Sequence, residues 1–220
     1  MRLGIAISGA GTNMLALAHA CRDGRIPAAI TLVASDRTDA PGLARAQELG
    51  LPIAAIPRRE DDTRATHDAR LRAAFDTSGV DCILLAGYMR ILTAEFVAAY
   101  AGRLLNIHPS LLPRHKGLHT HRAALAAHDS LHGATVHFVT PDLDGGPAVL
   151  QGTVPVLPDD DEVSLAARVQ RCEHVLYPTA VEWLARGRLR CNAAGLPELD
   201  GELLTTPRVI RFDARGIRHD

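Results

Sequence analysis

This chain of 220 residues has no excess of positive charge. Lys and Arg together number 24 and Asp and Glu number 25, which gives a formal net charge of −1 at pH 7. Without a basic balance there is no electrostatic reason to expect nucleic acid or a membrane surface as a partner. Lysine itself is almost absent, since Lys116 is the only one, but this scarcity carries no functional weight.

Paired cysteines and long apolar runs are missing as well. Cys21, Cys82, Cys172 and Cys191 lie far apart with no C-x-x-C spacing, which indicates small apolar residues in a reducing compartment rather than disulfides or metal ligands. No apolar run is long enough to cross a bilayer, and the chain opens on a strand-like run instead of a charged leader. We therefore expect a cytoplasmic protein.

Short apolar runs alternate with longer amphipathic runs through the first half of a chain that is long enough to bury a sizeable core. This alternation predicts βαβ units, and so an α/β fold with a mostly parallel twisted sheet and helices on both faces. The expected strands are Arg2–Ile7, Ile30–Ser35, Ile53–Ile56, Cys82–Ala86 and Leu104–Ile107, and the expected helices lie near Asn13–Cys21, Pro41–Leu49, Ala65–Phe75 and Ala94–Tyr100.

The second half changes character. Ala134–Val139 and Val149–Val156 flank a connection that contains Gly and Asp, which predicts an antiparallel pair added to the sheet. A long helix is expected from about Glu162 to Leu184, capped by the acidic run before it and kinked at Pro178. Beyond it, Arg208–Phe212 is the one strand-like run in what otherwise reads as peripheral covering.

The first strand leads into Ser8-Gly9-Ala10-Gly11-Thr12-Asn13. Two glycines let backbone amides approach an anion closely, and a helix start adds favourable partial charge, so a phosphate site is favoured over a simple tight turn. A dinucleotide motif would want a third small residue where Met14 stands, and Asp36 after the second strand supports it only weakly. No Gly-Lys-Ser/Thr follows, so this is not a nucleoside-triphosphate loop.

An amide and an imidazole stand two residues apart at Asn106 and His108. In an extended backbone they point to the same face, and Pro109 keeps His108 out of helical geometry. A hydrogen-bond donor beside a titratable ring suits a reaction in which negative charge develops on a carbonyl oxygen. A lone histidine is usually a core residue, but ligands bind at this end of parallel strands, so we favour a functional pair.

Two further groups have an ordinary and a functional interpretation. The loop Thr140–Gly146 is typical of a solvated turn, yet a carboxylate from it beside an imidazole would favour the charged ring. Gln170 and Glu173 lie three apart on one helical face, off the apolar stripe. A solvated face is the default interpretation there, and binding of sugar hydroxyls is the alternative.

Histidines cluster at His108, His115, His119 and His121 and suggest a metal site, which is the main rival chemistry. Three of them lie in a loop with Pro and Gly, without an H-x-x-x-H on a clear helix or a nearby Cys pair. Ordinary loop histidines are therefore the better interpretation. His137, in an alternating strand, is expected to be structural or to support the site from behind.

Five motifs together resemble the phosphoribosylglycinamide formyltransferase family, in order and with compatible spacing from about Arg2 to Gly201. The resemblance implies a Rossmann-like formyltransferase domain over residues 1–201 and a tail of uncertain role over residues 202–220. It implies an enzyme of purine biosynthesis that moves a formyl group from 10-formyltetrahydrofolate to the amine of phosphoribosylglycinamide, as a monomer or homodimer. The motifs are Ser8–Asn13, Ala86–Leu92, Asn106–Pro113, Gly117–His119, and Val136–Val139 through Asp144–Gly146.

The resemblance also assigns roles to residues of this chain. It implies that the catalytic set is Asn106, His108 and Asp144. It implies that Gly11, Thr12 and Asn13 hold the substrate phosphate and that Gln170 and Glu173 contact the ribosyl and glycinamide portion. The positions that match the folate pocket are Arg64, Met89, Arg90, Ile91, Leu92, Asn106, Thr140, Pro141, Asp142, Leu143 and Asp144. No metal is implied, and His115 and Lys116 depart from residues common in relatives.

Sibling formyltransferases share the Asn, His and Asp set. A methionyl-tRNA formyltransferase would carry a further C-terminal nucleic-acid-binding domain, so it is not expected here. A formyltetrahydrofolate hydrolase would usually carry a further N-terminal domain, but it stays an alternative. A sugar-nucleotide formyltransferase is harder to exclude, although the phosphate loop and Glu173 favour the ribosylglycinamide acceptor. A nicotinamide-dependent oxidoreductase and a metal-binding protein are the alternatives from other classes.

Overall fold

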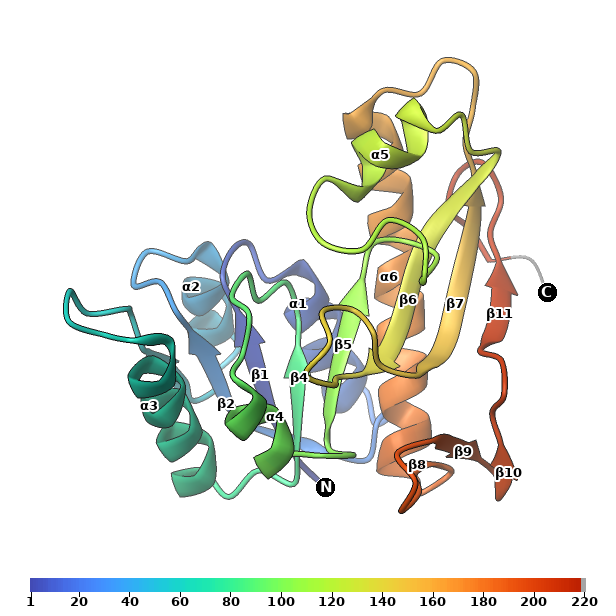
Figure 1. Ribbon diagram of the computed structural model, residues 1–220. Helices are drawn as coiled ribbons and strands as arrows, with labels where there is room; N and C mark the ends of the chain where they lie inside the picture. Colours follow the sequence, from blue (N-terminus) through green and yellow to red (C-terminus); the bar gives the residue numbers. More distant parts are fainter. Residues whose placement is uncertain (219–220) are drawn as a thin grey trace.

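The computed structural model describes residues 1–218 and has a large mixed sheet at its centre (Figure 1). Its first five strands pair only in parallel with one another, as the alternation of apolar runs predicts. Each begins and ends within two residues of its predicted bounds. They are β1 (Arg2–Ile7), β2 (Ala29–Ser35), β3 (Ile53–Ala55), β4 (Cys82–Leu85) and β5 (Leu104–His108).

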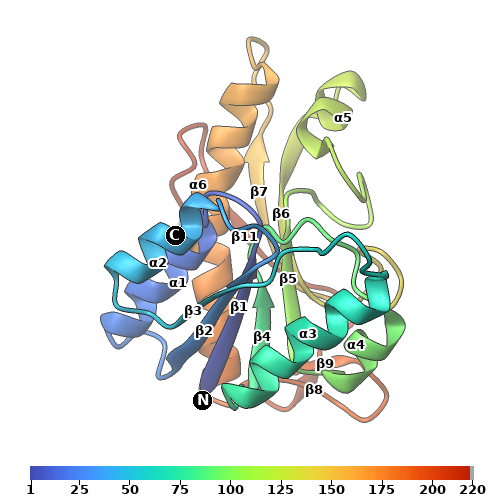
Figure 2. The ribbon, with the colours of Figure 1, turned by 90° about the vertical axis from the view of Figure 1, so that its left-hand side faces the viewer.

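Helices cover both faces of this parallel part (Figure 2). Leu3, Ile5 and Ile7 of β1 pack with α1, α2 and α6, while Ala6 faces the core formed with α3 and α4. Because both faces are buried, β1 and β4 read as continuous apolar runs rather than as alternating ones. The helices are α1 (Thr12–Arg22), α2 (Pro41–Glu48), α3 (Arg64–Thr77), α4 (Ala94–Ala99) and α6 (Glu162–Ala185).

The predicted antiparallel pair extends the sheet beyond β5. Strand β6 (Leu131–Phe138) runs antiparallel to both β5 and β7 (Ala148–Pro155), and β11 (Arg208–Arg211) then pairs in parallel with β7. The complete order is β11-β7-β6-β5-β4-β1-β2-β3. The α/β fold with an antiparallel extension is thus confirmed, while a domain division at residue 201 stays a prediction.

Four short elements were not predicted. Helix α5 (Thr120–Ala126) begins after His119, which has a left-handed backbone and makes no side-chain cap. With seven residues it is too short for a clear helical period. The strands β8 (Leu189–Cys191), β9 (Pro197–Leu199) and β10 (Glu202–Leu203) form a small antiparallel sheet below α6 in Figure 1.

Helix α6 spans 24 residues and starts as predicted. Asp161 is its N-cap, and a reciprocal hydrogen-bond pair with Ser164 forms a capping box. Asp160 has a further use, because it forms a buried ion pair with Arg168, and this hydrogen bonding lowers the Asp160 pKa to about 2. The helix continues through Pro178, and a kink there stays a prediction.

Candidate active site

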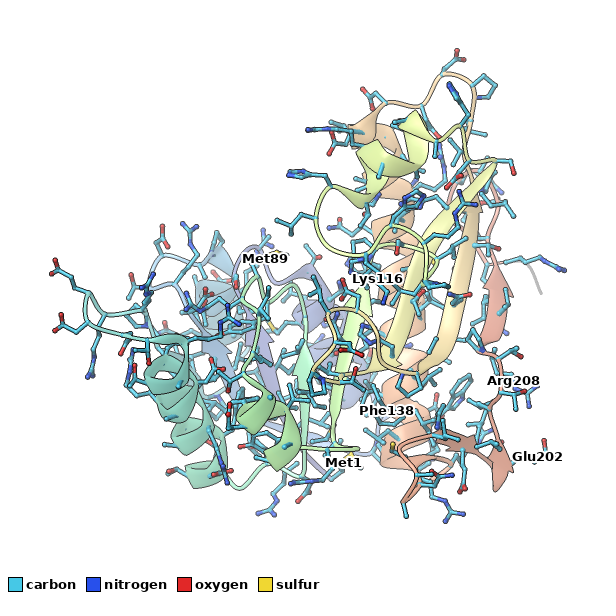
Figure 3. The ribbon with its side chains drawn as sticks, viewed as in Figure 1. Met1, Met89, Lys116, Phe138, Glu202 and Arg208 are labelled. Atoms are coloured by element: carbon cyan, nitrogen blue, oxygen red, sulfur yellow. The ribbon has the colours of Figure 1, made fainter. Side chains whose placement is uncertain are left out.

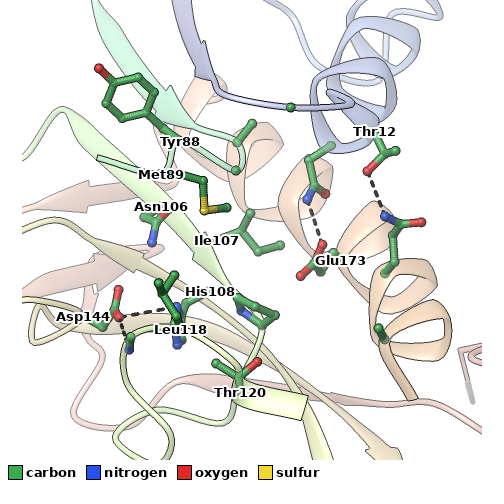
Figure 4. Close-up of a pocket in the computed structure, with 18 of the residues that line it drawn as sticks. Thr12, Tyr88, Met89, Asn106, Ile107, His108, Leu118, Thr120, Asp144 and Glu173 are labelled. Atoms are coloured by element: carbon green, nitrogen blue, oxygen red, sulfur yellow. Dashed lines mark hydrogen bonds and ion pairs between the residues drawn. The ribbon is translucent and has the colours of Figure 1, made fainter. Parts of the chain in front are cut away.

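The carboxyl ends of β1, β4 and β5 open into a cleft of about 650 Å³, which is within the usual range for a ligand site (Figure 4). In a parallel sheet these strand ends lie along one edge, so residues distant in sequence meet there. The remaining walls come from the loop that leads into α5, from the tip of the β6–β7 connection, and from the face of α6 that carries Gln170 and Glu173.

The β1–α1 turn forms one wall with the properties expected of an anion site. Gly11, the N-cap of α1, has φ 70° and offers no side chain to the first backbone amides of the helix. A side chain there would press against Gly42 of α2, 3.0 Å from the added Cβ, so the turn needs glycine for space as well as for conformation. The first helical turn itself contains no acidic residue that would occupy the positive end of the helix dipole.

The same wall continues onto α6 through two side-chain hydrogen bonds, both drawn in Figure 4. Asn13 Nδ2 donates to Glu173 Oε2 at 2.8 Å, and Gln170 Nε2 donates to Thr12 Oγ1 at 3.2 Å. Glu173 is buried, contrary to the default interpretation of a solvated face, and burial raises its pKa to about 7. The structure therefore brings all five predicted acceptor-binding residues together.

Asn106 and His108 both lie at the end of β5 and line the cleft, as their spacing predicts. His108 Nδ1 lies 3.5 Å from Asp144 Oδ2, so the contact that the sequence left open is present (Figure 4). The other ring nitrogen, Nε2, donates to the backbone carbonyl of His115 at 3.0 Å. A protonated ring can satisfy both partners at once, because only then do both nitrogens carry hydrogen.

Asp144 reaches His108 from a strained turn. Its backbone has φ 47°, a left-handed conformation that Asp tolerates better than most residues. Its Oδ2 also accepts a hydrogen bond from the Gly117 backbone N–H at 2.9 Å. The carboxylate thus ties the β6–β7 connection to the loop before α5 and holds a negative charge beside the imidazole.

His137 supports Asn106 from the neighbouring strand β6. Burial lowers the His137 pKa to about 4, so the ring is neutral at pH 7. Its Nδ1–H donates to the Phe138 carbonyl at 3.0 Å, which leaves Nε2 as an acceptor. Asn106 Nδ2 donates to that nitrogen at 3.1 Å, so the amide is oriented with its second N–H still available. This agrees with the supporting role expected for His137.

The opposite wall of the cleft is apolar and exposed. Met89, on the loop after β4, is 67% exposed, and Leu118 is 72% exposed (Figures 3 and 4). Ile91 and Leu143 are half exposed on the same rim. Large apolar side chains left in water around a cavity mark a surface that a ligand covers. Met89, Arg90, Ile91, Leu143 and Asp144, all predicted for the folate pocket, line this cleft.

Other residues predicted for the folate pocket lie outside the lining. Arg64 is exposed at the first position of α3, and Leu92 is buried in the core formed with α3 and α4. Thr140, Pro141 and Asp142 belong to the same turn as Asp144 but do not line the cavity. Their roles stay predictions. Conversely, the cleft is also lined by four residues that lie outside the five motifs and were given no role in binding the substrates, namely Thr120, His121, Glu162 and Ala166.

The histidine cluster is organised by hydrogen bonds. His121 lies in α5 rather than in a loop, so that expectation was wrong, and its Nδ1 is 3.1 Å from His132 Nε2. His115 Nε2 donates to Asp129 at 2.7 Å. Within residues 1–218, no three His, Cys, Asp or Glu side chains are grouped so that they could hold a metal ion. Nor does any helix in that span have the length and apolar character needed to cross a membrane.

Comparison with known proteins places the chain in a family. Residues 1–181 match the family described as Formyl transferase. The chain is 47% identical over 206 residues to the phosphoribosylglycinamide formyltransferase of Escherichia coli K12, covering 93% of this chain and 96% of that protein. It is 42% identical over 203 residues to the Haemophilus influenzae protein of the same name, covering 92% and 95%.

A solved structure of a protein with the same name is also similar to this chain. The phosphoribosylglycinamide formyltransferase of Coxiella burnetii, in complex with CHES, matches with a TM-score of 0.90 and 40% identity over 95% of this chain and 98% of that one. The resemblance carried by the sequence motifs is therefore confirmed. The chain belongs to the formyl transferase family.

Proposed function

We propose that this protein transfers the formyl group of 10-formyltetrahydrofolate to the amine of 5′-phosphoribosylglycinamide, a step of de novo purine biosynthesis. The observation that carries the proposal is the arrangement of the cleft. Asn106, His108 and Asp144 lie between a helix start suited to a phosphate and an apolar wall suited to a flat aromatic ligand. These are the chemical features of the two substrates.

The acceptor lies along the polar wall in this proposal. Gly11, Thr12 and Asn13 bind its phosphate through backbone amides at the start of α1, where the helix dipole favours an anion. Gln170 and Glu173 bind the ribosyl and glycinamide portion. Their hydrogen bonds with Thr12 and Asn13 link the phosphate loop to α6. A single continuous surface therefore contacts the whole acceptor.

The formyl donor lies along the apolar wall. Met89, Ile91 and Leu118 are exposed in the free protein. Burying them against the ring system of the folate contributes favourably to the free energy of binding. Arg90, Leu143 and Asp144 complete this side of the cleft. The folate is a co-substrate that arrives and leaves in each cycle, and no metal takes part in the proposed step.

The reaction is a direct acyl transfer. The amine of the acceptor attacks the formyl carbon, and the bond from that carbon to the folate nitrogen then breaks. One proton leaves the amine and one reaches the folate nitrogen, through water. The free N–H of Asn106 and the positive charge of protonated His108 stabilise the oxygen that becomes negative in between. Asp144 and the His115 carbonyl orient the ring toward the reacting atoms.

Folate release tests the proposal. Purified protein is mixed with 10-formyltetrahydrofolate, with and without phosphoribosylglycinamide, and tetrahydrofolate is followed by absorbance while the formylated product is identified by mass. We expect release only when phosphoribosylglycinamide is present. Release without an acceptor would identify a hydrolase, and release only with an amino-sugar nucleotide would identify a sugar-nucleotide formyltransferase.

A further inference from the structure

Two polar residues from the sequence motifs have no part in the reaction above, namely Ser8 and Asp36. They follow β1 and β2, and these strands are parallel neighbours with Ile7 paired to Ser35, so both residues emerge at the same sheet edge. Ser8 Oγ donates to Asp36 Oδ1 at 2.6 Å. The carboxylate that weakly suggested a nucleotide cofactor is therefore engaged with the first residue of the phosphate loop.

The Ser8 hydroxyl makes a second hydrogen bond, to the other wall of the cleft. The Met89 backbone N–H donates to Ser8 Oγ at 2.9 Å, across 81 residues of sequence. A hydroxyl has one proton and two lone pairs. Because the hydroxyl donates its hydrogen bond to Asp36, a lone pair of the Ser8 oxygen faces the Met89 N–H. Ser8 is buried, so water competes poorly for this position.

The segment that donates this hydrogen bond makes few other backbone hydrogen bonds. Residues 86–93 contain no helix or strand, although Met89 and Ile91 on it present apolar side chains to the cleft. Near its start, the Ser8 backbone N–H donates to the Gly87 carbonyl at 3.1 Å. At its far end, the Thr93 N–H donates to the buried carboxylate of Asp68 at 2.7 Å. The Ser8 hydroxyl thus holds the segment between these two points.

We propose that Ser8, oriented by Asp36, is a positioning residue for the donor wall. It fixes the Met89 backbone next to the acceptor loop, of which Ser8 is the first residue. The inference rests on the proposed function and adds that donor binding depends on a hydroxyl belonging to the acceptor loop. Without that hydroxyl the donor has to order the Met89 segment as it binds, and this ordering weakens its affinity.

The test compares four variants in the transfer assay. Ser8→Ala and Asp36→Ala are each expected to raise the donor KM about three- to tenfold, while the acceptor KM and kcat stay within about twofold. Asp36→Asn retains a side-chain oxygen that accepts from the Ser8 hydroxyl, so it should restore the donor KM. Asp39→Ala removes an exposed carboxylate three residues away, paired with Arg37, and serves as the matched control.

Three outcomes would overturn the inference. The first is a donor KM unchanged in Ser8→Ala. The second is an equal rise in both KM values together with a lower Tm, which would show a general loosening of the fold. The third is an Asp36→Asn variant as impaired as Asp36→Ala, which would indicate charge rather than orientation of the hydroxyl. A wild-type protein without transfer activity would instead overturn the proposed function itself, before any variant is compared.

Discussion

The two walls of the cleft prepare for their ligands in opposite ways. On the acceptor wall, Asn13 and Glu173 are buried and already hydrogen-bonded to each other before any ligand arrives. On the donor wall, Met89 and Leu118 stand in water on loops and gain stabilisation only when they are covered. On the proposed function, this difference predicts that the acceptor is selected by preformed polar geometry and that the donor is held by burial of apolar area.

The largest effect is expected where the walls meet. Asn106→Ala removes the amide that faces the developing negative charge, so kcat should fall about 10²–10³-fold. Both KM values should change little, because the amide acts on the transition state rather than on either ground state. Steady-state kinetics with each substrate varied in turn measures this. A kcat within tenfold of wild type would remove Asn106 from the proposed chemistry.

The buried carboxylate of the acceptor wall predicts a dependence of stability on pH. Burial raises the pKa of Glu173 to about 7 from its ordinary value of 4.5. Between those values the folded state holds a proton that the unfolded chain has released, so stability falls as pH rises. Relative to Glu173→Gln, the wild type should lose up to about 3 kcal/mol between pH 4.5 and 7.5. Urea unfolding of both proteins across this range measures the difference.

Comparing the two proteins isolates Glu173 because the buried histidines are common to both. His132 and His137 have pKa values lowered to about 4 by burial, so they act with the opposite sign. Their contribution is present above pH 6.5 and is lost as pH falls toward 4, in both proteins alike. Parallel stability curves for wild type and Glu173→Gln would mean that Glu173 is not buried as the structure shows.

The acceptor wall should also respond to loss of its hydrogen-bonded pair. Asn13→Ala keeps the backbone amide proposed to bind the phosphate but removes the side-chain hydrogen bond that orients Glu173, which is proposed to contact the glycinamide portion. Hydrogen bonds to charged groups contribute about 1.5–3 kcal/mol, so the acceptor KM should rise roughly ten- to hundredfold. The donor KM should stay within about twofold of wild type, because the two walls share no part of this pair. Equal rises in the acceptor KM and the donor KM would contradict the assignment of one wall to each substrate.

Much of this architecture could be predicted because local patterns agree with the fold. The strands that carry the site were predicted to within two residues, since buried parallel strands produce short unbroken apolar runs. The pairing of Asn106 with His108 on one face follows from the two-residue period of a strand. The glycines of the first turn were predicted to let backbone amides approach an anion, which stays a prediction, and the structure adds that Gly11 packs against Gly42.

What could not be predicted depends on contacts between distant segments or on very short elements. Nothing in the local sequence places the His115 carbonyl against His108, or turns the Ser8 hydroxyl toward Met89. Glu173 lies off the apolar stripe of α6, so its burial is visible only once α1 is packed beside it. Helix α5 has too few residues to show a period, and the cleft residues Thr120 and His121 were missed with it.

The smallest effect is expected on the donor wall. Leu118→Ala removes part of an apolar surface that only a bound ligand covers, so the donor KM should rise about fivefold and the stability of the free protein should not change. Val209→Ala, on the exposed edge strand β11, is the matched control because it removes a similarly exposed apolar side chain far from the cleft. Kinetics and thermal unfolding are measured on both. A rise in the acceptor KM alone would place Leu118 on the polar wall and reverse the assignment of the two sides.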